Sequence, residues 1–213
     1  MPAPNLCIKG IKIHRHLLKY MFPQVIDGQI DTIKFLNASR NVMQIIDKFG
    51  KVFAALKYDM LNNIEKISQR YNIDKISHAT LQNLILMEKK TGKNAVAADA
   101  LLWLARELKM IQILFDKMIK AERANVSIED LGPKISEAYV EVMGTHEWMA
   151  QQLFSLLAKT PPSRTQVLLS LAENTPGVEE TTINTLDIIS KQLQSNLIIL
   201  KSFLYDNDIG HVL

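Results

Sequence analysis

The chain has 213 residues, of which 47% are hydrophobic and 22% charged, as in an ordinary soluble globular protein. The formal charge of +3 contains no block of lysine or arginine, so the composition argues against nucleic-acid binding but allows contact with an anionic membrane surface. The single cysteine, Cys7, excludes an internal disulfide and a cysteine metal site, and it indicates a reducing compartment.

Apolar residues recur with helical spacing almost throughout, which predicts an all-α protein. In chain order, helices are expected at 30–49, ended by Gly50; at 51–71; after a cap at Ser77 or Thr80, stopping at Gly92; at 94–122; from Pro133 to about 159; at 163–172; and at 181–205. The helix at 94–122 is apolar over much of its circumference and should be central.

No strand is expected, because the alternation at 8–13 is brief and leads into helical spacing. No repeat or linker divides the chain, so we expect one domain of about eight helices over residues 1–213. Neither a signal peptide nor a membrane-spanning run is evident. A cytoplasmic protein that meets membranes only peripherally is the natural expectation.

The most informative residues are Asp59, Asn63 and Lys66, at i, i+4 and i+7 of the second long helix. This spacing points an acid, an amide and a base the same way, beside an apolar stripe. A carboxylate accepts hydrogen bonds, an ammonium group donates them and a carboxamide does both, which suits a ligand covered with hydroxyl groups. A solvated helix face would show the same pattern, so the motif alone does not decide.

Two aromatic or basic positions add to this pattern. Trp103 lies in the most hydrophobic helix, as a core residue or as a flat apolar platform for a sugar ring, with Arg106 and Lys109 near its rim or simply in solvent. On the expected helix His146 would share a face with apolar residues and could donate a hydrogen bond at the mouth of a cavity, although a structural histidine is the commoner case. Trp148 must point elsewhere, which suits a water–lipid boundary.

Motifs for other chemistry are missing from the sequence. It has no G-x-S-x-G nucleophile elbow, no cysteine–histidine motif and no phosphate-binding glycine loop. His14 and His16 diverge on a helix and lack a third metal ligand nearby. We therefore expect no enzyme, no metal and no cofactor.

The ordered set D-x-x-x-N-x-x-K at 59–66, L-W-L-A-R at 102–106 and H-x-W at 146–148 resembles the glycolipid transfer protein family. The segments at 80–84, 87–89 and 111–112 agree, and the resemblance extends over about 30–205. It implies a two-layer helical sandwich, the GLTP fold, which holds one lipid with its headgroup at the surface and its chains between the layers. It also implies a non-enzymatic carrier that touches membranes transiently, expected to be a monomer.

The resemblance assigns roles by position. Asp59, Asn63 and Lys66 would bind the sugar headgroup, Trp103 would stack on the first sugar, and His146 would meet the ceramide amide carbonyl. Trp148 would touch the membrane. The residues expected to contact the lipid chains are apolar: Leu56, Met110, Leu114, Phe154 and Leu157.

The choice of headgroup follows from three positions. The phosphate-binding branch of this superfamily has cations at the positions of Asn63 and Trp103, and another one turn after Trp103, where this chain has Glu107. A carboxylate there would repel a phosphate, which favours a glycosphingolipid. The alternatives are a ceramide-1-phosphate-type carrier, a glycolipid sensor or adaptor, and an all-α scaffold with a dead site.

Overall fold

The computed structural model describes residues 6–8, 11–91, 95–126, 128–144, 153–157, 160 and 162–209, and they are predominantly helical. The long helices are α1 (Thr32–Ile46), α2 (Ala54–Ile73), α4 (Val96–Arg123) and α8 (Glu179–Asp206). Shorter ones are α3 (Leu81–Lys90), α5 (Gly132–Met143) and α7 (Arg164–Leu171). Residues 153–157 are also helical, and 3₁₀ turns lie at Arg15–Tyr20, Asp47–Phe49 and Lys51–Phe53. The all-α prediction is confirmed.

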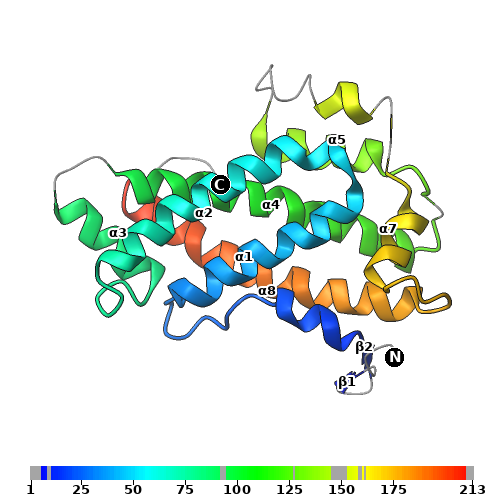
Figure 1. Cartoon of the computed structure of the whole chain (residues 1–213), viewed down its shortest axis with the longest axis horizontal. Helices are drawn as coiled ribbons and strands as arrows, with labels where there is room; N and C mark the ends of the chain where they lie inside the picture. The colour runs from blue at the N-terminus through cyan, green and yellow to red at the C-terminus, as the bar shows by residue number, and fades with distance from the viewer. Residues whose placement is uncertain are drawn as a thin grey trace.

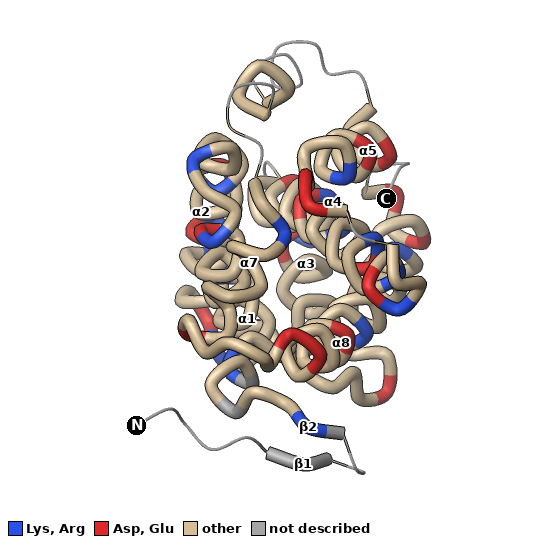
Figure 2. Tube along the Cα trace, turned by 90° about the vertical axis from the view of Figure 1, so that its right-hand side faces the viewer, with Lys and Arg blue, Asp and Glu red and all other residues tan. Residues whose placement is uncertain are grey.

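The helices form two layers. Figure 2 shows α1 and α2 on one side of the molecule and α4, α5 and α8 on the other. Helix α4 is central: it packs against α2 across the layers and against α5 and α8 within its own layer (Figure 1). Most of its side chains are buried, as its apolar circumference predicted.

Several helix ends lie where the sequence placed them. Thr80 is the N-cap of α3, because its hydroxyl oxygen accepts a hydrogen bond from the Asn83 amide at 3.3 Å. Gly50 adopts a φ of 84° between two short 3₁₀ turns and separates α1 from α2. The first two predicted helices are thus confirmed, with 3₁₀ turns at their junction.

Two sequence expectations are wrong. The helix expected from Pro133 to about 159 ends at Met143, because Gly144 takes a φ of 65° and a ψ of −154°, which no helix continues. The N-terminal region forms a short antiparallel hairpin, β1 (Leu6–Ile8) and β2 (Ile11–Ile13), where no strand was expected. Strand β2 is stabilised against α8, where Ile13 is fully buried and the His14 amide donates to the Thr185 hydroxyl at 2.9 Å.

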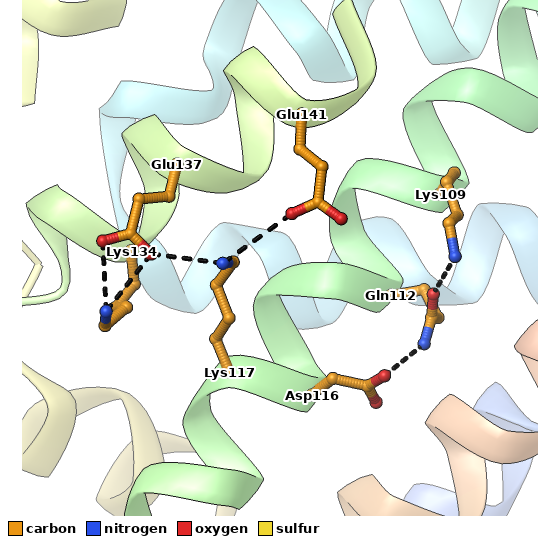
Figure 3. Close-up of polar contacts among 7 residues, drawn as sticks. All are labelled: Lys109, Gln112, Asp116, Lys117, Lys134, Glu137 and Glu141. Carbon is orange, nitrogen blue, oxygen red and sulfur yellow. Dashed lines mark hydrogen bonds and ion pairs between the residues drawn. The ribbon is translucent and has the colours of Figure 1, made fainter. Parts of the chain in front are cut away.

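Polar contacts tie α4 to its layer (Figure 3). Lys117 pairs with Glu137 and Glu141 of α5 at 3.1 and 3.7 Å. On another face of α4, Gln112 donates to Asp116 at 2.6 Å, and Asp116 accepts from Ser190 of α8 at 2.7 Å. These contacts join α4 to α5 on one side and to α8 on the other.

The first turn of α4 depends on one buried carboxylate. Glu88, 5% exposed at the end of α3, accepts hydrogen bonds from the amides of Ala97 and Ala98 at 3.0 and 2.9 Å. We expect Glu88→Ala to lower the free energy of unfolding by about 2 kcal/mol, because two helix-terminal amides lose their acceptor. Urea unfolding measures the loss, and Glu65→Ala on the exposed face of α2 is the control. Equal losses in the two variants would contradict this role.

Candidate functional site

The acid, amide and base of α2 form a row that runs from the interior to solvent. Asn63 is buried, with 3% of its surface exposed, Asp59 is half-buried and Lys66 is exposed. Their spacing places them on the side of α2 that follows the α2–α4 contact. Asn63 is therefore not on a solvated face, and the simplest non-functional reading does not fit it.

Glu107 of α4 meets this row inside the protein. Its side chain is 1% exposed, and its Oε2 accepts a hydrogen bond from Asn63 Nδ2 at 3.4 Å. Its carboxyl also hydrogen-bonds to Asp59. Asp59, Asn63 and Glu107 together form what we call the polar cluster, which joins the two layers.

The protonation of the polar cluster follows from its burial. Burial, the charge of Asp59 and the hydrogen bond between the two carboxyl groups together raise the pKa of Glu107 to about 9, while the hydrogen bond from Asn63 acts in the opposite direction. Glu107 therefore keeps its proton at neutral pH, and the pair carries one negative charge, on Asp59. This corrects the sequence argument, in which Glu107 itself carried the charge that repels a phosphate.

Trp103 stands one turn before Glu107 on α4, at the surface end of the site. Its side chain is 38% exposed, so it is not a core residue. The Arg106 guanidinium carbon lies 4.9 Å from the centre of the indole ring, a cation–π contact that covers one face.

Lys109 does not join this site. It is half-buried and donates to Gln112 Oε1 at 2.8 Å, along the side of α4 that carries Asp116 (Figure 3). There it lines a separate cavity of about 210 Å³ together with Lys201, Leu197 and Ile198 of α8.

Apolar residues surround a small cavity next to the polar cluster along the same two helices. Of the five residues predicted to contact lipid chains, Leu56 of α2 and Met110 of α4 line this cavity, which has a volume of about 30 Å³. Phe154 packs edge-on against Tyr139 of α5, another lining residue, with ring centres 6.1 Å apart. Leu114 and Leu157 are buried in the surrounding core.

A larger cavity of about 260 Å³ lies at the start of α2 and shares Val52 and Leu156 with the small one. Lys48 and Lys51 lie at its wall together with Gln166 of α7. The shared residues place the two cavities side by side near the start of α2.

The remaining predicted positions, His146 and Trp148, lie outside the described residues. Sequence reasoning missed Val52, Tyr139, Leu153 and Leu156 as cavity residues, and it did not foresee that Glu107 would bond to Asn63. An acid in an otherwise apolar stretch of α4 was a usable signal for a buried polar contact.

Solved structures share this two-layer fold. A crystal structure of the fungal glycolipid transfer protein HET-C2 superposes with a TM-score of 0.76 at 24% identity, over 91% of this chain and 96% of that one. The apo form of mouse ceramide-1-phosphate transfer protein gives a TM-score of 0.75 at 16% identity, over 92% and 97% of the two chains. The fold is therefore the GLTP fold, and carriers of both headgroup classes have it.

Sequence comparison gives the family. The family model "Glycolipid transfer protein (GLTP)" matches residues 30–173, so the chain belongs to the glycolipid transfer protein family, whose members are lipid transfer proteins. Glycolipid transfer protein of Xenopus tropicalis is 30% identical over 171 residues, which is 77% of this chain and 82% of that protein. No catalytic family is indicated.

A longer relative also matches. Pleckstrin homology domain-containing family A member 8 of Danio rerio is 33% identical over 142 residues, which is 64% of this chain and 25% of that protein. The chain thus aligns with about a quarter of the length of this relative. Among the described residues, no helix is both long enough and apolar enough to span a membrane.

Proposed function

We propose that this protein binds one glycosphingolipid and carries it between membranes. The observation that supports this most directly is the α2–α4 pair, which is polar at Asp59, Asn63 and Glu107 and turns apolar around the small cavity at Leu56 and Met110. An amphipathic lipid needs this arrangement: hydrogen-bonding groups at its headgroup and apolar walls along its chains.

The proposal assigns the headgroup to Asp59, Asn63, Lys66 and Trp103. The indole would stack on the first sugar, and the α2 row would bond to its hydroxyl groups. A site built to pair with hydroxyl groups discriminates strongly, because a ligand that lacks them leaves buried polar groups unmatched. The negative charge of Asp59 disfavours a phosphate at the same place.

Affinity would come chiefly from the hydrocarbon chains. Each buried CH₂ group contributes about 0.8 kcal/mol, so the chains supply binding energy while the headgroup supplies identity. The small cavity of about 30 Å³ holds little more than one water molecule, so the chains enter by widening it. Leu56, Met110, Leu114, Phe154 and Leu157 are the proposed chain contacts.

Two further roles rest on the family resemblance. His146 would donate to the ceramide amide carbonyl, and Trp148 would contact the membrane during exchange. A single-domain, monomeric carrier that works from the cytoplasm and binds membranes peripherally fits these roles.

The test is transfer of labelled lipids between vesicles. We expect a labelled monohexosylceramide to be transferred at least about tenfold faster than a labelled ceramide-1-phosphate, because the site offers partners for hydroxyl groups and a repelling charge for phosphate. Mass spectrometry of lipid retained through purification is the complementary measurement. Equal or faster transfer of ceramide-1-phosphate would overturn the headgroup assignment, and tight binding without transfer would indicate a sensor.

A further inference from the structure

Glu107 is the one member of the polar cluster that the headgroup assignment does not use. It is a fully enclosed carboxyl on the central helix, and Asn63 and Asp59 of the opposite layer both bond to it. A buried acid without a matching cation destabilises a protein. A role for Glu107 at the headgroup site would explain why an acid lies between two proposed headgroup residues.

We propose that Glu107 is a positioning residue of the headgroup site, which fixes through two hydrogen bonds the atoms that Asp59 and Asn63 present to a sugar. This inference rests on the proposed function and adds a residue and a proton dependence to it.

The hydrogen bonds determine which atoms face the ligand. Asn63 Nδ2 donates to Glu107 Oε2, so the amide oxygen of Asn63 is directed away from Glu107. The carboxyl proton of Glu107 is donated to Asp59, which keeps its remaining lone pairs as acceptors. The cluster therefore offers acceptors to the ligand. Sugar hydroxyl groups and an amide N–H can donate to them, whereas a phosphate dianion cannot.

This arrangement requires the proton on Glu107. Without it, two carboxylates would face each other in a buried site and repel. Within the described structure, the charge that acts on the Glu107 carboxyl is that of Asp59 of α2. Loss of the proton should therefore disorganise the site rather than be compensated.

The experiment compares the pH dependence of transfer in the whole protein and in Glu107→Gln. The probe is a labelled monohexosylceramide in phosphatidylcholine vesicles, neither of which titrates between pH 7 and pH 10. With a pKa of about 9, about one protein molecule in ten keeps the Glu107 proton at pH 10. Because only that fraction has the organised site, the wild-type protein should bind the glycolipid about tenfold more weakly at pH 10 than at pH 7, and transfer should slow accordingly. Glutamine preserves both hydrogen bonds without titrating, so the variant should change by less than about twofold.

Two other variants separate positioning from general damage. Glu107→Leu has a similar volume but neither hydrogen bond, and we expect about tenfold weaker binding at every pH. Glu65→Gln makes the same carboxyl-to-amide change on the exposed side of α2 and should keep the wild-type profile. Far-UV circular dichroism at each pH confirms that the variants are folded.

The outcomes discriminate between the two proposals. Identical pH profiles for the wild type and Glu107→Gln, with good glycolipid transfer by both, would overturn the positioning role and leave the proposed function standing. If Glu107→Leu bound the glycolipid as tightly as the wild type, the positioning role would likewise be overturned and the proposed function would stand. No transfer of the glycolipid by the wild type at any pH would overturn the proposed function and this inference with it.

Discussion

Replacing Trp103 with alanine should lower glycolipid transfer by about thirtyfold to a hundredfold. The indole supplies a large flat apolar surface at the rim of the site, and loss of its stacking on a sugar corresponds to about 2–3 kcal/mol. Its exposure of 38% and its contact with Arg106 indicate that the ring is held at the surface and that the core does not depend on it. The measurement is the initial rate of vesicle-to-vesicle transfer of a labelled monohexosylceramide.

A matched control is available on α2. Tyr58 is 71% exposed and adjoins Asp59 in sequence, so Tyr58→Ala removes an exposed aromatic ring without touching the proposed platform. We expect this control to transfer at a rate within about twofold of the wild type. If Trp103→Ala transferred as fast as Tyr58→Ala, the platform role would be wrong.

Local signals in the sequence predicted most of the helical architecture. A capping threonine at position 80, a helix-ending glycine at position 50 and the apolar circumference of α4 depend on nearby residues, and all three predictions are confirmed. The end of α5 was missed because its apolar spacing continues past Gly144, whose backbone conformation interrupts it. The β1–β2 hairpin was missed because its stability comes from packing on α8, which three-residue strands do not reveal.

The site was only partly predictable for the same reason. Spacing placed Asp59, Asn63 and Lys66 on one side of a helix, but their very different burial depends on how α2 lies against α4. That register brings Asn63 to Glu107, two residues 44 positions apart, and turns Lys109 toward Gln112. The protonation of Glu107 is likewise a tertiary property, because isolated glutamates are ionised at neutral pH.

The buried Glu107 should also make the stability of the protein fall as pH rises, which is opposite to the usual behaviour of a carboxyl group. Its pKa is raised to about 9 in the folded protein from an ordinary value of 4.5, so between these values the folded state holds a proton that the unfolded chain releases. Stability from this group is complete below pH 4.5 and decreases as pH rises to about 9, with a slope of at most about 1.4 kcal/mol per pH unit.

The slope is best measured as a difference between the wild type and Glu107→Gln. Other groups also titrate: burial and the nearby charge of His16 lower the pKa of His14, so stability from that group rises with pH below about 6.5. Hydrogen bonds from Lys134 and Lys117 lower the pKa of Glu137, whose stabilisation is lost only in acid. These contributions are common to both proteins and cancel in the difference.

We expect urea unfolding at intervals from pH 5.5 to pH 8.5 to show that the free energy of unfolding of Glu107→Gln, relative to that of the wild type, increases by about 1 kcal/mol per pH unit. Glu65→Gln provides the control, because it makes the same chemical change on the exposed side of α2, where Gln69 donates to the carboxylate at 3.2 Å. The free energy of unfolding of Glu65→Gln should change with pH as that of the wild type does over this range. A parallel curve for Glu107→Gln as well would mean that Glu107 is ionised in the folded protein at neutral pH. The polar cluster would then carry two negative charges, and the hydrogen bond through which Glu107 positions Asp59 would not exist.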